Sequence, residues 1–380
     1  MYRSSLPALL LWYSDTEASN ILVSDTSVRK YTAIWQSHKP KEINWVKETF
    51  GDWIGEHVFD SKHEVVLDNA ILFDTFIYCF DPAYYARFRG KNAFLVHFQD
   101  ETYAGQYQLY ENFRGVFRNY WSSIFNPRFV RIFPLGFTAG LPRPLPPIKR
   151  ATEREYAWSF LGQTNKSSRP DMVTSLLRVQ PHLFFSTDDV PGFAIFNQTG
   201  SGPRRYSPAE YAKIMQESIF APSPMGNVHM ECYRVYEALE CGSIPMVEKR
   251  LTLDYFRKLL GDHPLPTVSE WPQAHSLMQR YLKNPEEMNR LQDRCMEWWR
   301  NYKLEYSQQI SKFIDERTRA DAEPVREPAS AIHKVPGWQA VELMRHHDLN
   351  ALSRRITRQA TRLIRSGKMR EAYRPGVRID

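Results

Sequence analysis

The chain has 380 residues, which is enough for two or three domains of ordinary size. Its composition, 42% hydrophobic and 24% charged, is that of a globular protein and excludes a disordered or collagen-like chain. The net charge of +7 favours acidic partners such as phosphorylated substrates, anionic lipid or nucleic acid. Four cysteines without a CxxC pair exclude a disulfide-dense scaffold and indicate a reducing compartment.

Short apolar runs alternate with polar or helical stretches in the first 140 residues. Five of them have the length and composition of buried strands: 9–13, 20–23, 71–79, 93–98 and 129–133. The segment 107–121 has helical spacing. Strands that alternate with helices predict a parallel sheet with helices on both faces.

A proline-rich segment follows, with four prolines between Pro142 and Pro147. Such a segment suits neither a helix nor a central strand, and it predicts a linker. Further alternation comes after it, with expected strands at 158–161, 183–186, 218–221 and 243–247 and a long helix at 285–314. We therefore expect a first domain over 1–140, a linker over 141–150, a second domain over 151–320, and a linker with a helical tail over 321–380.

The tail is strongly basic. Ten Arg or Lys and two acidic residues lie between Arg345 and Arg378, and apolar residues recur there mostly at steps of three and four from Leu349 to Ile364. This pattern fits a helix that docks on anionic lipid headgroups, and it fits equally a helix that packs its apolar stripe on the protein. Nucleic acid is not the expected partner, because no nucleic-acid-binding motif accompanies the charge.

The stretch between Ser218 and Glu248 contains the most candidate functional residues. A short strand is followed by a turn, a helix over 231–240 and another strand, and a helix N-terminus suits phosphate. The planar guanidinium group of Arg234 can bind a diphosphate through paired N–H donors. Glu237 lies three residues later on the same helix face, and its carboxylate can accept hydrogen bonds from both hydroxyls of a ribose. The alternative is a ladder of surface ion pairs along an ordinary helix.

The same stretch also contains a motif that resembles the signature of a known family. Arg-x-x-Glu-Ala-Leu-Glu-x-Gly-x-Ile-Pro at 234–245 resembles the nucleotide-sugar signature of exostosin-like glycosyltransferases, in the ribitol xylosyltransferase-like branch and its bacterial relatives. Weaker matches support it in the same order along the chain, so that the resemblance spans about 70–310: 96–101, 117–121, 132–136, 160–162 with Arg169, and 295–299. It implies an α/β fold of the GT-B type, two facing Rossmann-like domains with a cleft between them.

The resemblance also implies roles for individual residues. Arg234 would hold the donor diphosphate and Glu237 its ribose. Donor contacts are also expected from a loop, a turn and an arginine near the cleft: Lys166 and Arg169, Gly226 and Asn227, and Arg118. Lys166 and Arg169 are alternatively solvated loop charges. Such cations replace a metal in most GT-B enzymes, so no metal and no cofactor are expected, the nucleotide sugar being a substrate.

A general base must remove the acceptor proton in an inverting transfer. Asp100 and Glu101 follow the expected strand 93–98, at the strand end that faces the ligand crevice in open α/β sheets. Either is a candidate base, and the alternative is a helix N-cap. Asp15, after the first expected strand, and His97 are lesser candidates that would contact the acceptor, His97 being alternatively structural.

The sequence thus predicts an inverting, metal-independent glycosyltransferase (hexosyl- or pentosyltransferase). It would move a sugar from a nucleotide-diphosphate sugar, with UDP expected, to a hydroxyl of a growing or lipid-linked glycan in bacterial surface polysaccharide biosynthesis. No secretory or membrane-spanning pattern is evident, which predicts a cytoplasmic protein, peripheral on the inner membrane through its basic tail. Two alternatives remain open: a fucosyltransferase-like GT-B enzyme that uses GDP-fucose, and an inactive nucleotide- or glycan-binding protein of the same fold.

Overall fold

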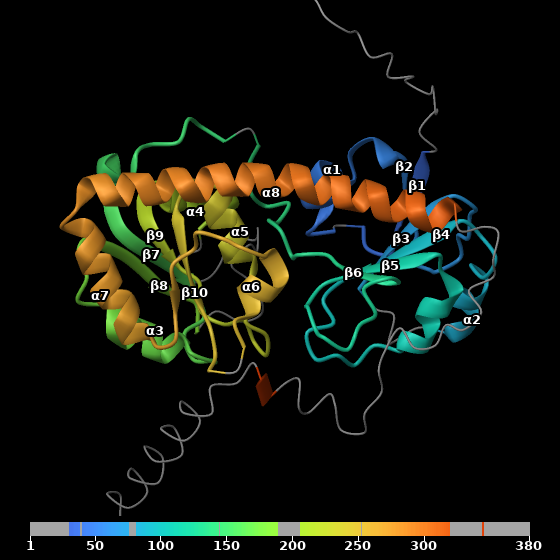
Figure 1. Cartoon of the computed structure of the whole chain (residues 1–380), viewed down its shortest axis with the longest axis horizontal. Coiled ribbons are helices and arrows are strands. Elements are labelled where there is room, and N and C mark those ends of the chain that lie inside the picture. Colours follow the sequence, from blue (N-terminus) through green and yellow to red (C-terminus); the bar gives the residue numbers. More distant parts are fainter. Residues whose placement is uncertain are drawn as a thin grey trace, which may run out of the picture.

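The computed structural model describes residues 30–38, 40–75, 81–143, 145–188, 206–251, 253–319 and 344–345. The expected strands 9–13 and 20–23, the candidate Asp15 and nearly all of the basic tail lie outside them. Within the described part, two α/β units lie side by side, and one long helix runs along both (Figure 1). Each unit is built on a wholly parallel sheet, so the expected α/β, GT-B architecture is confirmed.

The first unit contains six strands among the described residues, in the order β2-β1-β3-β4-β5-β6. These are β1 (Tyr31–Trp35), β2 (Ile54–Phe59), β3 (Ala70–Asp74), β4 (Ala93–His97), β5 (Gly115–Arg118) and β6 (Val130–Ile132). Every residue of β3 and β4 is buried, as expected for parallel strands covered on both faces. The helices of this unit are α1 (Ile43–Phe50) and α2 (Pro82–Ala86).

The prediction of a helix over 107–121 was wrong. The structure has a 3-10 helix at Tyr107–Asn112 and then the four-residue strand β5. Val116 and Phe117 pair with the buried strand β4 on one side and with β6 on the other, and this lateral pairing outweighs the helical spacing of the segment. The expected strand 71–79 appears as β3, and residues 76–80 lie outside the described part.

The second unit contains five described strands in the order β11-β10-β9-β7-β8. These are β7 (Tyr156–Gly162), β8 (His182–Ser186), β9 (Ser218–Pro222), β10 (Ile244–Glu248) and β11 (Thr267–Val268). Its helices are α3 (Arg169–Leu176), α4 (Pro208–Gln216), α5 (Tyr233–Glu240), α6 (Tyr255–Leu260) and α7 (Trp271–Leu282). Short 3-10 turns lie at Gly51–Trp53 and Ala151–Glu153.

Helix α8 (Pro285–Arg319) joins the two units (Figure 1). Its first half binds the second unit, where the Gln292 amide donates to the carbonyl oxygen of Gly242 over 2.9 Å. Its second half binds the first unit, where the Tyr306 hydroxyl donates to the carbonyl oxygen of Ile132 over 2.8 Å. The helix thus belongs to both cores. None of the helices in the described ranges has the length and apolarity to cross a bilayer.

Candidate functional site

The site lies where the strand order of the second sheet reverses. The chain passes from β7 to β8 on one side and then places β9 on the other side of β7. Ligands of open α/β sheets bind outside the carboxyl ends of the strands at such a switch point. The two loops that leave these strand ends are 163–168, after β7, and 223–232, after β9. They contain or border five of the donor residues predicted from the sequence: Lys166, Arg169, Gly226, Asn227 and Arg234.

Three cations gather at the switch point. Arg169 donates from Nε to the carbonyl oxygen of Met225 over 3.2 Å, and so connects the two loops. Arg234 lies over the ring of Phe160, 4.2 Å from its centre, and donates to the carbonyl oxygen of Leu161 over 2.8 Å. The Nε atom of Arg234 is buried and has no hydrogen-bond partner in the described structure. The third cation is Lys166, whose Nζ donates to Oδ1 of Asn227.

The pKa values show that these cations repel one another. The pKa of Arg169 is lowered to about 10, mainly by burial and then by the charge of Arg234. Burial also lowers the pKa of Lys166, as do the charges of Arg169 and Arg234. Like charges that are held together away from water favour the binding of an anion.

The expected turn at Gly226 and Asn227 is present and receives a carboxylate from the other unit. Oε1 of Glu101 accepts hydrogen bonds from the backbone N–H groups of Asn227, Val228 and His229 over 3.1, 2.9 and 3.1 Å. A Cβ atom at Gly226 would lie 3.1 Å from the same oxygen, so glycine permits this close approach. Consecutive N–H groups that converge on one oxygen form an anion-binding nest.

Glu248 supports both loops and is a residue that the sequence analysis missed. It ends β10 and is buried. Its Oε1 accepts from the Ser168 hydroxyl and from the backbone N–H of Met225, and its Oε2 accepts from Arg250 over 2.7 Å. A carboxylate that directly follows a strand-forming run is the signal that pointed to Asp100 and Glu101, and it was equally present here.

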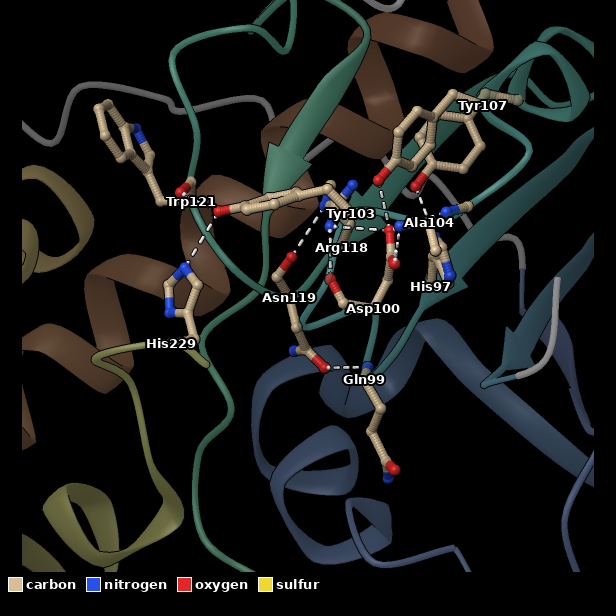
Figure 2. Close-up of polar contacts among 12 residues, drawn as sticks. His97, Gln99, Asp100, Tyr103, Ala104, Tyr107, Arg118, Asn119, Trp121 and His229 are labelled. Atoms are coloured by element: carbon tan, nitrogen blue, oxygen red, sulfur yellow. Dashed lines mark hydrogen bonds and ion pairs between the residues drawn. The ribbon is translucent and has the colours of Figure 1, made fainter. Parts of the chain in front are cut away.

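Asp100 occupies a different position from its neighbour Glu101. Its side chain is buried inside the first unit, where it accepts from Tyr107 and from the backbone N–H of Ala104 over 2.7 Å (Figure 2). Arg118, fully buried, lies 3.3 Å from its Oδ2. Burial alone would raise the pKa of Asp100, but Arg118 and the hydrogen bond from Tyr107 hold it below its usual value. Asp100 is therefore an ionised member of a buried polar cluster.

His97 and Arg118 belong to this same cluster. His97 shares a hydrogen bond with the Tyr110 hydroxyl over 2.6 Å, and burial lowers its pKa to about 4. Arg118 lies over the ring of Phe125, 4.1 Å from its centre. The structure thus separates the predicted residues into two groups, a donor group with Glu101 and a cluster of His97, Asp100 and Arg118 behind it.

Glu237 also faces protein partners. It accepts from the hydroxyl of Thr138, which belongs to the segment after β6, over 2.8 Å, and from Tyr211 over 3.1 Å. Burial raises its pKa, against the opposing effects of Thr138 and Arg234. Each carboxylate oxygen can accept a second hydrogen bond, so these contacts are compatible with the expected ribose contact.

Further contacts hold the two units together beside the site. Tyr103 shares a hydrogen bond with Nε2 of His229 over 3.0 Å, across the interface (Figure 2). Glu231 accepts from the backbone N–H of Leu135 in the first unit over 2.8 Å and from Tyr255 in its own unit over 2.8 Å. Burial raises the pKa of Glu231 to about 7. Glu231 precedes α5, so it is a loop residue rather than a member of the helix face that carries Arg234.

The loops at this interface contain strained backbone. Gln99, Tyr103, Tyr120 and Ser167 have φ between 53° and 64°, in the left-handed region that non-glycine residues seldom adopt. Such conformations gather at functional sites, where the surrounding contacts hold them. Within the described ranges, no group of three or more His, Cys, Asp and Glu side chains has the arrangement of a metal site.

Comparison with known proteins finds similarity over part of the chain. Residues 145–318 match the family described as RXYLT1 C-terminal domain. Two curated relatives are ribitol-5-phosphate xylosyltransferase 1 of Mus musculus, 23% identical over 177 residues, and that of Danio rerio, 24% identical over 174 residues. Each match covers 43% of this chain, and it covers 38% of the mouse protein and 39% of the fish protein.

Among solved structures, T4 phage BGT in complex with UDP and Mn2+ has a TM-score of 0.44 at 11% identity over 75% of this chain and 99% of its own. The DNA-modifying enzyme β-glucosyltransferase, solved with and without uridine diphosphoglucose, has a TM-score of 0.45 at 12% identity with the same coverage. The family match, residues 145–318, covers the second unit, which holds the cations and the amide nest. This part of the chain is therefore similar to the RXYLT1 C-terminal domain, which supports the expected relationship to the exostosin-like glycosyltransferases.

Proposed function

We propose that this protein is a glycosyltransferase that moves a sugar from a nucleotide-diphosphate sugar to a hydroxyl group. The observation that carries the proposal is the convergence of Lys166, Arg169 and Arg234 at the switch point of the second sheet, beside the amide nest of 227–229. Guanidinium groups bind diphosphates through paired N–H donors, and nests bind oxyanions. The relation to the exostosin-like family gives this anion site a nucleotide sugar as its expected ligand.

The cation cluster suits the chemistry of the departing nucleotide. Breaking the bond from the sugar to the diphosphate leaves negative charge on the diphosphate, and positive groups preorganised there stabilise the transition state. The proposed reaction is inverting and draws its charge stabilisation from these side chains rather than from a metal. An α-linked donor would then give a β-linked product.

Glu101 is the proposed general base. It belongs to the first unit, which the GT-B arrangement assigns to the acceptor, and it reaches the donor loop across the interface. Asp100 is 2% exposed and surrounded by donors of its own unit, which keeps its oxygens from an acceptor hydroxyl. A base must come within hydrogen-bond reach of the proton that it removes.

The biological setting is also a proposal. The names of the two curated relatives describe xylosyl transfer to ribitol 5-phosphate, and this supports a pentose as the transferred sugar. The proposed donor is a UDP-linked pentose or hexose. The proposed acceptor is a growing or lipid-linked glycan of a bacterial surface polysaccharide. The basic tail would hold the protein at the cytoplasmic face of the inner membrane.

Thermal-shift binding with UDP, GDP, CMP and their sugars, each with and without a divalent metal, tests the proposal. A nucleoside diphosphate at 100 times its Kd adds roughly 2.7 kcal/mol to the free energy of unfolding. Arg234→Ala should abolish that gain, and Arg257→Ala, which removes an exposed arginine on α6, should keep it. Stabilisation by GDP instead of UDP would favour the fucosyltransferase-like alternative. No stabilisation by any nucleotide would contradict the transferase and leave a binding protein of the same fold.

A further inference from the structure

The carboxylate of Glu101 occupies an anion site that belongs to the other unit. One oxygen accepts three consecutive N–H groups, from Asn227, Val228 and His229. Glu101 also acts electrostatically on Lys166 and Arg169, raising the pKa of both against the effect of burial. Glu101 therefore supplies the negative charge for a nest and a cation cluster that come from residues 166–234.

We infer that the amides of 227–229 are an oxyanion-binding site, that Glu101 fills this site in the absence of ligand, and that a diphosphate oxygen takes its place. This inference rests on the proposed function and concerns how its donor site is regulated. It adds Val228 and His229 to the site, through their backbone N–H groups.

Electrostatics and space argue against simultaneous occupancy. Each amide has one proton to donate, and the three protons of the nest already point at Oε1 of Glu101. A diphosphate placed on the cations would lie beside this carboxylate, and the two negative charges would repel each other. The buried Nε of Arg234, which has no hydrogen-bond partner in the described structure, shows that the cluster still has capacity for an anion.

The substitution of one anion by the other has a mechanistic consequence. When the diphosphate enters the nest, the Glu101 carboxylate loses its three donors and becomes available to an acceptor hydroxyl. The candidate base is thus held by hydrogen bonds until the donor is present. Activation of the acceptor hydroxyl therefore requires that the donor has bound.

Binding measurements can detect the competition. If Glu101 fills the nest in about 90% of molecules, its removal tightens binding about 10-fold, since the apparent affinity is reduced by the fraction that is competent to bind. Isothermal titration of the full chain with inorganic pyrophosphate and with UDP should show this gain for Glu101→Ala. Glu101→Gln keeps an acceptor oxygen but loses the charge, and should bind with an affinity between the two.

Glu42→Gln is the matched control. Glu42 also bridges the units, because its carboxylate accepts from the Tyr233 hydroxyl and from Gln99, but it does not fill the nest. The control should leave the affinity for pyrophosphate unchanged, so a gain in Glu101→Ala alone reports the vacated nest rather than a loosened interface.

The failures of the two ideas are distinguishable. If the native chain binds UDP, Arg234→Ala loses this binding, and Glu101→Ala binds pyrophosphate no more tightly than the native chain, the donor site stands and the competition is overturned. If neither the native chain nor Glu101→Ala binds any nucleoside diphosphate, the proposed function fails and the competition fails with it. Should Glu101→Ala not fold, as judged by its melting curve, the comparison of Glu101→Gln with Glu42→Gln decides.

Discussion

Arg118 shows what a buried charge requires of its neighbours. It is fully buried, and its guanidinium lies 3.3 Å from the Asp100 carboxylate, 2.8 Å from the carbonyl oxygen of Asn119 and over the ring of Phe125. The ion pair repays part of the cost of taking both charges out of water, and removing one member leaves the other uncompensated. We therefore regard Asp100 as a positioning residue that fixes the loop in which its neighbour Glu101 lies.

Asp100→Ala should therefore lower the free energy of unfolding by about 3–5 kcal/mol. Urea unfolding at pH 7 measures this loss. Asp293→Ala is the control, because Asp293 pairs with Arg150 on the surface and such exposed pairs contribute about 1 kcal/mol or less. If Asp100→Ala were as stable as the native chain and lacked only turnover, Asp100 would be the base after all.

At the scale of elements, Glu248 joins the two loops of the donor site. It receives hydrogen bonds from Ser168, next to Arg169, and from the backbone of Met225, next to Gly226. The cation cluster and the nest come from different loops, so their relative position depends on such a link. In the described part of the chain the side chain of Glu248 accepts hydrogen bonds from Ser168, Met225 and Arg250, so its proposed role is to position the two loops.

Glu248→Gln should weaken UDP binding about 10-fold, because each hydrogen bond to a charged group contributes about 1.5–3 kcal/mol to holding the loops. Titration calorimetry measures the affinity, and a melting curve shows whether the fold persists. The effect on Kd should exceed any effect on the rate of the bound complex. An unchanged Kd would show that the loops keep their positions without Glu248.

A second prediction at this scale concerns the packing of helix α8 on the first unit. Phe313 is buried near its end and meets Phe117 of β5 edge to face, with ring centres 5.1 Å apart. Phe313→Ala should cost about 3–5 kcal/mol of unfolding free energy. Leu304→Ala, on the exposed side of the same helix, should change it by about 0.5 kcal/mol or less. Equal losses in the two variants would contradict the packing of α8 on the first unit.

The features that the sequence predicted correctly are those whose pattern lies in a short contiguous segment. The strands at 93–98 and 218–221 are continuous apolar runs, and the structure confirms them as β4 and β9. Strand β2 was missed because its residues are largely exposed and carry little apolar pattern. Arg234 was predicted because its motif is contiguous, and the contact of Glu101 with Val228 was not, because it joins residues 127 positions apart.

At the scale of the whole molecule, two buried groups have opposite effects on stability over the same pH range. The pKa of Glu231 rises on folding from its ordinary 4.5 to about 7, so the native state binds a proton that the unfolded state releases, and stability falls as pH rises from 4.5 to 7. The pKa of His97 falls from 6.5 to about 4, so stability falls as pH drops from 6.5 to 4. Each contribution is about 3 kcal/mol, so the two nearly cancel.

Single variants should expose each contribution. The melting temperature of Glu231→Gln should rise with pH between 4.5 and 6.5, because the His97 contribution is no longer opposed by that of Glu231. That of His97→Asn should fall with pH over the same interval, because only Glu231 remains. Calorimetry at closely spaced pH values measures both slopes. Identical profiles in the two variants would show that these groups do not titrate as their burial requires.

The path of α8 has a final consequence for motion. The helix has 35 residues and is about 50 Å long, and the chain also crosses between the units in the segment between β6 and β7 (Figure 1). In the described part of the chain, the two units are thus connected at two places. The easiest relative motion of the units is a rotation about the line through these two connections, because any other rotation would stretch the segment or bend the helix. We therefore expect spin labels placed on the two units far from α8 to report a wide distribution of separations, and labels placed beside it a narrow one.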